Sequence, residues 1–225
     1  MSHPRVQRVV VVGTGTGIGK THLTLALARA LRRSCPTVAL KPLESGGDAD
    51  ARAFDVESSW TIAPHPLIPL KNPVSPHLAA RLEGREVHVE RLVAWVAEQE
   101  QQAIYDDMLP YAVSLVETAG GVLSPLSRTA RNLELARALD PALLLLVAPD
   151  SLGVLHALST TLIAMSTLGR PPDLVALSAA RVDASTGTNA AELRELGIAD
   201  PAFVLPHGAT DATPLAERVL AHFSS

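Results

Sequence analysis

The sequence predicts an α/β fold in which helices cover both faces of a parallel β-sheet, and three observations lead to it. Short apolar runs without helical period alternate along the chain with segments of helical period. The chain is 47% hydrophobic but only 3% aromatic, a composition that suits buried strands and closely packed helices built from Ala, Val and Leu. A loop rich in glycine and threonine joins the first apolar run to the first helical segment.

Strands are expected wherever a β-branched or leucine-rich run lacks helical period. These runs are residues 6–12, 37–40, 111–116, 143–147, 174–177 and 203–205. Helices are expected at residues 20–33, 87–108, 151–168, 189–196 and 214–223, with a short one after Asp50. Prolines recur too often between residues 62 and 76 for regular structure there. We predict a single domain over residues 1–225, because no repeat, low-complexity segment or linker interrupts the pattern.

Composition and charge exclude several classes of protein. The formal net charge is −4, so a basic surface for nucleic acid is not expected. No apolar stretch is long enough to span a bilayer, and the first residues do not resemble a signal peptide. Cys35 is the only cysteine, which excludes an internal disulfide, and the eight histidines show no metal-binding spacing. We therefore expect a cytoplasmic protein without a nucleic-acid or membrane partner.

Residues 13–21 read GTGTGIGKT and lie between the first strand and the first helix, which is the context of a phosphate-binding P-loop. Glycines let the backbone turn its N–H groups around a phosphate chain, and the following helix points its positive end at the same place. Lys20 is then placed to reach the β- and γ-phosphates, and the hydroxyl of Thr21 to bind Mg²⁺. The predicted fold is therefore a P-loop NTPase-like parallel sheet with helices on both faces.

The spacing of this loop adds information. The usual pattern has four residues between the first glycine and the Gly-Lys-Thr group, whereas here five residues separate Gly13 from Gly19. Gly15 also stands where partition-type ATPases place a signature lysine, which argues against that class.

Charged side chains follow the predicted strands at the edge where open α/β sheets bind ligands. Lys41 ends the second strand, where an ammonium is placed to stabilise charge on a transferring phosphoryl group, or simply to be solvated. Glu117 follows the third strand and is placed to hold Mg²⁺, with capping of a turn as the alternative. Asp48 and Asp50 follow a Ser-Gly-Gly turn, and from the residues alone either completes a metal site or caps a helix.

Taken together, these segments resemble the dethiobiotin synthetase family over residues 13 to 208. The segments in question are 13–21, 41–46 (KPLESG), 50–54 (DARAF), 75–77 (SPH), 83–85 (EGR), 116–121 (VETAGG), 152–156 (LGVLH) and 206–208 (PHG). The resemblance implies that Lys41 is catalytic together with Lys20. It also implies that Thr21, Asp50 and Glu117 hold Mg²⁺, which favours Asp50 over Asp48.

The other contacts that the resemblance implies fall into two groups, one to the nucleotide and one to the substrate. The nucleotide contacts are Gly13, Thr16, Gly17, Ile18, Gly19, Lys20, Thr21, His22, Asp50, Glu117, Thr118, Ala119, Gly120, Pro206, His207 and Gly208. The substrate contacts are Thr14, Ser45, Gly153, Val154, Leu155 and His156. The last four of these resemble a loop that caps the substrate of the neighbouring subunit, so the family implies a homodimer.

The activity that the resemblance implies uses 7,8-diaminononanoate, CO₂ and ATP with Mg²⁺, and yields dethiobiotin, ADP and phosphate through a carbamate and a carbamic-phosphoric anhydride. An alternative from another class is a partition-type ATPase switch without a small-molecule product. A ligase that forms amides with a glutaminase domain is disfavoured, since the chain is too short to carry that domain and Cys35 lies in the wrong context for its nucleophile.

Some positions depart from the family pattern. Thr118 replaces a glycine, and Leu155 replaces an asparagine. Ala180 and Arg181 occupy the place of the asparagine that reads adenine in the family. Because alanine has no side-chain polar group and arginine only donates, we expect weaker discrimination among nucleotide bases.

Overall fold

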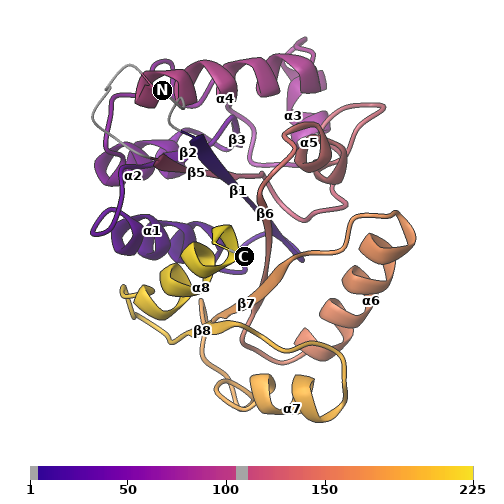
Figure 1. Ribbon diagram of the computed structural model, residues 1–225. Helices are drawn as coiled ribbons and strands as arrows, with labels where there is room; N and C mark the ends of the chain where they lie inside the picture. The colour runs from indigo at the N-terminus through magenta and orange to yellow at the C-terminus, as the bar shows by residue number, and fades with distance from the viewer. Residues whose placement is uncertain (1–4, 105–110, 225) are drawn as a thin grey trace.

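The computed structural model describes residues 5–104 and 111–224, and its central sheet confirms the predicted α/β fold (Figure 1). The six strands of this sheet are all parallel and lie in the order β2-β5-β1-β6-β7-β8. They are β1 (Arg5–Gly13), β2 (Thr37–Leu40), β5 (Tyr111–Glu117), β6 (Leu143–Pro149), β7 (Leu174–Ser178) and β8 (Phe203–Leu205).

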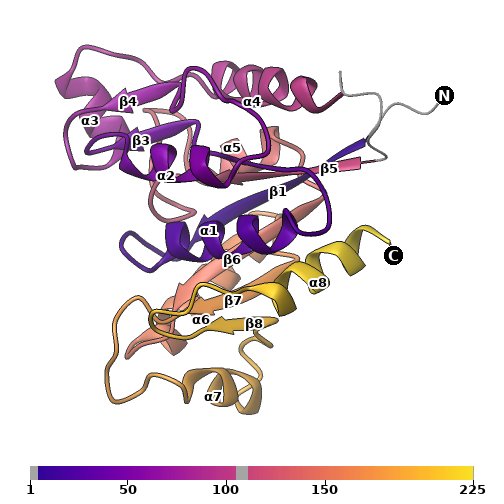
Figure 2. The same ribbon diagram turned by 90° about the vertical axis from the view of Figure 1, so that its left-hand side faces the viewer.

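Helices cover both faces of the sheet. They are α1 (Lys20–Leu31), α2 (Ala49–Glu57), α3 (Pro76–Leu82), α4 (Val89–Ile104), α5 (Asn132–Ala138), α6 (Val154–Thr167), α7 (Asn189–Glu195) and α8 (Thr213–Phe223). Helices α1, α2 and α8 bury their apolar side chains on one face, which Figure 2 shows toward the viewer. Helices α3 to α7 share a second core on the opposite face.

The side chains of β1 show why both faces are covered. Val9 and Val11 point into the core beneath α1, where Leu27 is fully buried. Val10 and Val12 point into the core beneath α4 to α6. Successive residues of a strand face opposite sides, so an uninterrupted valine run requires a helical layer on each side.

A second sheet of two short strands lies beside the first, and the sequence did not predict it. Its strands are β3 (Leu43–Ser45) and β4 (Ile68–Leu70), paired in parallel. The prediction of irregular structure from 62 to 76 is therefore wrong at β4, where Pro69 pairs in register with Glu44. Strands of three residues are too short to show a pattern, and a two-strand sheet has free edges on which proline is tolerated.

Two further differences concern helices. Helices α3 and α5 were not predicted. Each has only seven residues and gives little periodic signal, although α7, of the same length, was predicted. The helix predicted at 87–108 is observed from Val89 to Ile104, and the end of that prediction lies outside the described residues.

No helix in the described ranges is long and apolar enough to cross a membrane, and the cytoplasmic location stays a prediction.

The topology brings the predicted site segments together. Strand β1 lies between β5 and β6, and β2 lies on the far side of β5. Because the strands are parallel, the residues that follow β1, β2 and β5 emerge at the same edge of the sheet. The phosphate loop, Lys41 and Glu117 occupy that edge.

Candidate active site

Glycines shape the loop between β1 and α1. Gly17 and Gly19 have φ angles of 69° and 88°, in the left-handed region that glycine adopts without strain. A Cβ atom on Gly13 would lie 2.7 Å from Cδ of Lys20, so this glycine makes room for the lysine side chain. Nζ of Lys20 donates to the carbonyl oxygen of Gly15 at 3.0 Å, which keeps the ammonium folded over the loop.

Three oxygen-bearing side chains meet beside the loop. Thr21 lies in the first turn of α1, Asp50 in the first turn of α2, and Glu117 at the end of β5. Oγ1 of Thr21 lies 2.9 Å from Oδ2 of Asp50 and 2.9 Å from Oε1 of Glu117. Glu117 is fully buried, and its second oxygen accepts a hydrogen bond from Oγ1 of Thr24 at 2.6 Å. The three predicted metal ligands are therefore close together.

Lys41 lies between the two carboxylates. Its side chain is 5% exposed, and Nζ donates to Oδ2 of Asp50 at 2.8 Å and to Oε1 of Glu117. Burial alone would lower the pKa of Lys41, but the charges of Glu117 and Asp50 outweigh it and raise that pKa above its usual value. Burial likewise opposes ionisation of Asp50, yet Lys41 holds the pKa of this carboxyl below its usual value. The ammonium is thus a fixed positive charge at the end of β2.

Lys20 is the second cation of the site. Burial lowers its pKa to about 8, against the opposing charge of Glu117 and with the added repulsion of Lys41. A buried ammonium whose neighbours compensate it incompletely is stabilised by an added anion. This arrangement suits a group that binds a phosphate chain.

Glu44 is a site residue that the sequence reasoning missed as such. Its carboxylate accepts hydrogen bonds from the backbone N–H groups of Asp50 and Ala51, both at 3.0 Å, and so fixes the first turn of α2. Asp48 pairs instead with Arg52 at the surface. Of the two aspartates that the residues alone left open, the structure brings Asp50 to the site.

A cavity of about 610 Å³ opens in front of these groups. The predicted site residues that line it are Thr16, Gly17, Gly19, Lys20, Thr21, His22, Lys41, Ser45, Asp50, Glu117, Ala119 and Gly120. Its other lining residues are Glu44, Pro73, Val74, Ser75, Pro76, Ser124 and Ala180. Pro73 and Val74 carry no chemical signal that sequence reasoning can use, whereas Ser75 and Pro76 belong to a segment on which the family resemblance rests.

Several predicted contacts do not line the cavity. Among them are Gly13, Ile18 and Thr118: Ile18 packs into the core beneath α1, and the backbone N–H of Thr118, just after β5, donates to the carbonyl oxygen of Val11 at 3.0 Å. Thr14 also lies outside the lining, with its backbone N–H bonded to the carbonyl of Val147 at 3.0 Å.

Three hydroxyl groups at or near the cavity are buried without a hydrogen-bond partner among the described residues. They are Oγ of Ser45, which lines the cavity, Oγ1 of Thr14, and Oγ of Ser178, which lies next to Gly19. A buried polar group without a partner is costly, by about 1–3 kcal/mol. The Ser45 hydroxyl therefore fits the predicted role of binding a polar substrate, whereas Thr14 lies outside the cavity lining.

The predicted base-binding segment lies beside the start of α1. Nε2 of His22 lies 2.6 Å from the carbonyl oxygen of Ala209, and Nδ1 of His207 lies 2.9 Å from that of Ala179. Residues 206–208 do not line the cavity, so the structure brings this segment close to the site but not into its wall. Ala180, the residue in place of the family asparagine, does line the cavity.

The segment from Gly153 to His156 lies apart from the cavity of its own chain. Gly153 precedes α6 with a φ angle of 93°, and Val154 is fully buried beneath the helix. Leu152, just before it, is 85% exposed. None of the residues from Gly153 to His156 lines this cavity, so their predicted contact with a substrate, and the homodimer that it implies, stay predictions.

The donor set at the predicted metal position consists of oxygen atoms from Thr21, Asp50 and Glu117, which suits Mg²⁺. Within the described residues, no group of three or more His, Cys, Asp or Glu side chains gathers to hold a metal. The residues fit a cation that is also bound by phosphate oxygens, because Mg²⁺ usually takes only one or two carboxylates together with substrate phosphates.

Comparisons with known proteins show the family to which the chain belongs. A family model described as an AAA domain matches residues 7–197. The ATP-dependent dethiobiotin synthetase BioD of Caulobacter sp. (strain K31) is 34% identical over 224 residues, which span 94% of this chain and 93% of that protein. The protein of the same name from Anaeromyxobacter dehalogenans (strain 2CP-1 / ATCC BAA-258) is 35% identical over 208 residues, 87% of this chain and 88% of that protein.

Among solved structures, a ParA family ATPase from Chlorobium tepidum TLS is similar with a TM-score of 0.52, at 15% identity over 96% of this chain and 89% of that chain. An identity this low shows a shared P-loop fold and nothing of the activity. The sequence relatives cover nearly the whole chain at twice that identity. The chain therefore belongs to the ATP-dependent dethiobiotin synthetase family, the family that its motifs resemble.

Proposed function

We propose that this enzyme joins 7,8-diaminononanoate and CO₂ into dethiobiotin, with cleavage of ATP to ADP and phosphate in the presence of Mg²⁺. The observation that supports this most is the position of Lys41. Lys41 directly follows β2, and its buried ammonium lies beside Asp50 and Glu117. The residue lines the cavity together with the phosphate loop. The names of the sequence relatives support the same reaction.

The chemistry proceeds in three steps. One amine of the substrate attacks CO₂ and loses a proton, which gives a carbamate. A carbamate oxygen then attacks the γ-phosphorus of ATP and expels ADP, which gives a carbamic-phosphoric anhydride. The second amine attacks the carbonyl carbon and loses a proton, phosphate leaves, and the cyclic urea is closed. None of these steps needs a nucleophile from the protein.

Charge is what the protein must supply in the second step. Negative charge spreads over the oxygens of the transferring phosphoryl group, and fixed positive groups stabilise it. Lys20 lies over the phosphate loop and Lys41 beside Asp50 and Glu117, and both residues line the cavity. Thr21, Asp50 and Glu117 would hold Mg²⁺, whose charge would offset part of the charge of the phosphates.

Orientation of the diamine is the second requirement. The hydroxyl of Ser45 lines the cavity and has no hydrogen-bond partner among the described residues, so it is placed to bind a polar group of the diamine. The exposed segment around Gly153 supports a homodimer in which this segment closes the partner's cavity. Backbone N–H groups at the start of α6 would then bind the substrate carboxylate, so that Leu155 in place of an asparagine does not abolish binding.

A partition-type switch without a small-molecule product is not favoured. The likeness to a ParA family ATPase is one of fold. Gly15 stands in place of the signature lysine of that class, and the buried Ser45 hydroxyl has no role in a pure nucleotide switch.

The direct test mixes protein, Mg-ATP, the diamine and ¹³C-bicarbonate, and detects products by mass spectrometry. We expect phosphate release that depends on the diamine, and dethiobiotin whose mass is raised by the difference between one ¹³C and one ¹²C atom. Lys41→Ala should abolish both, whereas Lys71→Ala, at an exposed lysine outside the site, should change neither. A rate of ATP hydrolysis that is the same with and without the diamine, together with no labelled product, would show that the proposal is wrong.

A further inference from the structure

Strand β2 lies at the edge of the main sheet, and side chains satisfy its outer N–H groups. The backbone N–H of Thr37 donates to Oγ of Ser59 at 3.0 Å, and that of Ala39 donates to Oγ of Ser58 at 3.0 Å. The next N–H on this side of the strand belongs to Lys41, because alternate residues share an edge. An unsatisfied N–H group at this position would be costly if buried.

His65 satisfies that N–H group. Its Nε2 accepts a hydrogen bond from the backbone N–H of Lys41 at 2.8 Å. Since a peptide N–H only donates, Nε2 must be unprotonated. The proton of the neutral ring is then on Nδ1, which lies 2.7 Å from Oδ1 of Asp55 and donates to it. Asp55 thereby fixes the tautomer that Lys41 requires.

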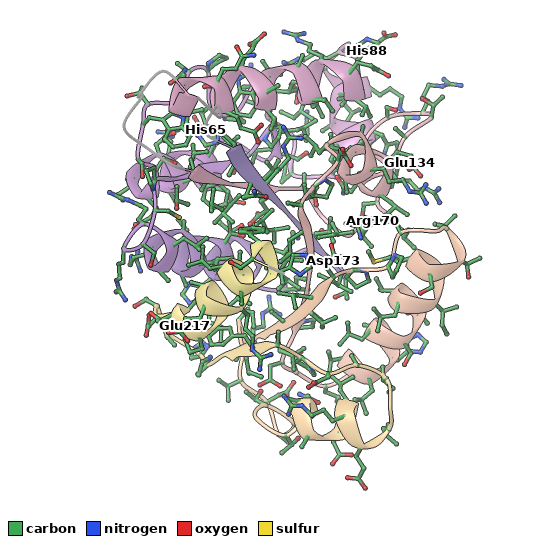
Figure 3. The ribbon with its side chains drawn as sticks, in the orientation of Figure 1. His65, His88, Glu134, Arg170, Asp173 and Glu217 are labelled. Atoms are coloured by element: carbon green, nitrogen blue, oxygen red, sulfur yellow. The ribbon has the colours of Figure 1, made fainter. Side chains whose placement is uncertain are left out.

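The ring of His65 is also fixed by packing. Its side chain is 1% exposed. It lies 5.8 Å from the ring of Trp95 and 6.5 Å from that of Phe54, centroid to centroid, and is tilted to both. Trp95 belongs to α4 and Phe54 to α2, and Figure 3 shows His65 between these two helices. The imidazole is therefore a rigid link between the helical layers and the end of β2.

We propose that His65 is the positioning residue of Lys41. The last pairing of β2 with β5 in the sheet is at Leu40, so Lys41 leaves the sheet with its N–H held by His65. The ammonium must reach Asp50 and Glu117 at once, and therefore depends on where this backbone is held. A displacement of about 1 Å in a reacting group can cost roughly 10²-fold in rate. The proposal rests on the function proposed above, in which Lys41 is catalytic.

The test compares two substitutions of His65 with a matched control. His65→Leu removes the acceptor, and we expect kcat to fall by about tenfold while the KM for ATP changes by less than about twofold. His65→Gln keeps an acceptor at the position of Nε2, and should recover most of kcat. Ser59→Ala removes the same kind of hydrogen bond, the one to the backbone N–H of Thr37, which lies four residues before Lys41. This variant should lower the melting temperature without lowering kcat.

The outcomes separate the two proposals. Circular dichroism at the assay temperature identifies the variants that are folded. Full kcat in His65→Leu overturns the inference, as does an equal loss of kcat in Ser59→Ala or no recovery in His65→Gln. If Lys41→Ala abolishes turnover while His65→Leu does not, only the role of His65 is wrong. If Lys41→Ala leaves kcat unchanged, the proposed role of Lys41 fails first and that of His65 with it.

Discussion

Nζ of Lys41 lies 2.8 Å from Oδ2 of Asp50, and the same ammonium is hydrogen-bonded to the buried carboxylate of Glu117. The lysine that we propose to act on the phosphoryl group is thus also the counter-ion of the two carboxylates that we propose to hold Mg²⁺. A metal ion held by these carboxylates would therefore compete with the ammonium of Lys41 for the same oxygen atoms.

Competition between the two cations leads to the first prediction. Lys41→Met should raise the affinity for Mn²⁺ in the absence of nucleotide by at least about tenfold, or about 1.4 kcal/mol, because two carboxylates are left without a counter-charge. Isothermal titration calorimetry measures this, with Lys71→Met as a control at an exposed lysine. An unchanged Mn²⁺ affinity would show that Lys41 does not compete for this position.

Lys20 should act differently from Lys41. Its side chain lies over the phosphate loop, and its neighbours compensate its buried charge only in part. Lys20→Ala should therefore weaken nucleotide binding by at least about tenfold, and abolish turnover, since charge-assisted bonds to phosphate contribute roughly 1.5–3 kcal/mol. Binding of a fluorescent ATP analogue and phosphate release measure the two effects. Unchanged affinity in a folded variant would contradict the assignment.

The sequence predicts those parts of the site that depend on local pattern. The phosphate loop is contiguous in the chain, and its glycine positions are dictated by backbone geometry. Lys41 and Glu117 follow buried strands, so the parallel sheet itself brings them together. The fold class follows for the same reason, from runs long enough to show a period. Predicted contacts that depend on a second copy of the chain, and the single-domain organisation, stay predictions.

Other parts of the site depend on contacts that no local pattern encodes. His65 is 24 residues away from Lys41 in the chain, in a proline-rich segment that reads as irregular. Glu44 is recognisable only once α2 is seen to begin above it. The strands β3 and β4, which carry the Ser45 side of the cavity, are too short to show a period in the sequence, although they pair with each other and bury Leu43, Ile68 and Leu70 in the core.

The proposed homodimer gives a third prediction. Leu152 is 85% exposed at the start of the segment that we propose to contact the partner. Leu152→Asp should shift the protein toward monomer and raise the KM for the diamine, because a charge is costly to bury in an interface. Val56, 74% exposed on α2, provides the matched control Val56→Asp. Light scattering during size-exclusion chromatography measures the mass. A fully active monomer of the unaltered protein would contradict the dimer.

The neutral state of His65 gives a prediction about pH. Burial lowers the pKa of His65 below its ordinary value of 6.5, against the opposing charges of Asp55 and Glu44 and with the added effect of Lys41. At a pH between the lowered pKa of the folded chain and the value of 6.5 in the unfolded chain, His65 is protonated only in the unfolded chain. The stability due to neutral His65 is thus complete above pH 6.5 and is lost as the pH falls through the lowered pKa.

This loss should be absent from His65→Gln, since glutamine does not titrate. We expect the melting temperature to fall more between pH 7.5 and pH 5.5 in the unaltered protein than in His65→Gln, as thermal unfolding followed by circular dichroism will measure. Equal falls in both proteins would mean that His65 accepts a proton in the folded state as readily as in the unfolded one.

The last prediction concerns the choice of base. Discrimination against a wrong base needs a buried donor and acceptor that the wrong base leaves unpaired, at about 1–3 kcal/mol for each group. Ala180 lines the cavity where the family has an asparagine, and offers no side-chain group for this purpose. The phosphates still meet Lys20 and the loop, so triphosphate affinity should survive while base selection weakens. We expect ATP to be favoured over CTP or GTP by less than about tenfold in kcat/KM, the equivalent of about 1.4 kcal/mol.

Ala180→Asn restores the missing donor and acceptor and should increase that preference for ATP. Parallel assays of both proteins with the three triphosphates decide the matter, and a hundredfold preference for ATP in the unaltered protein would show that another group reads the base.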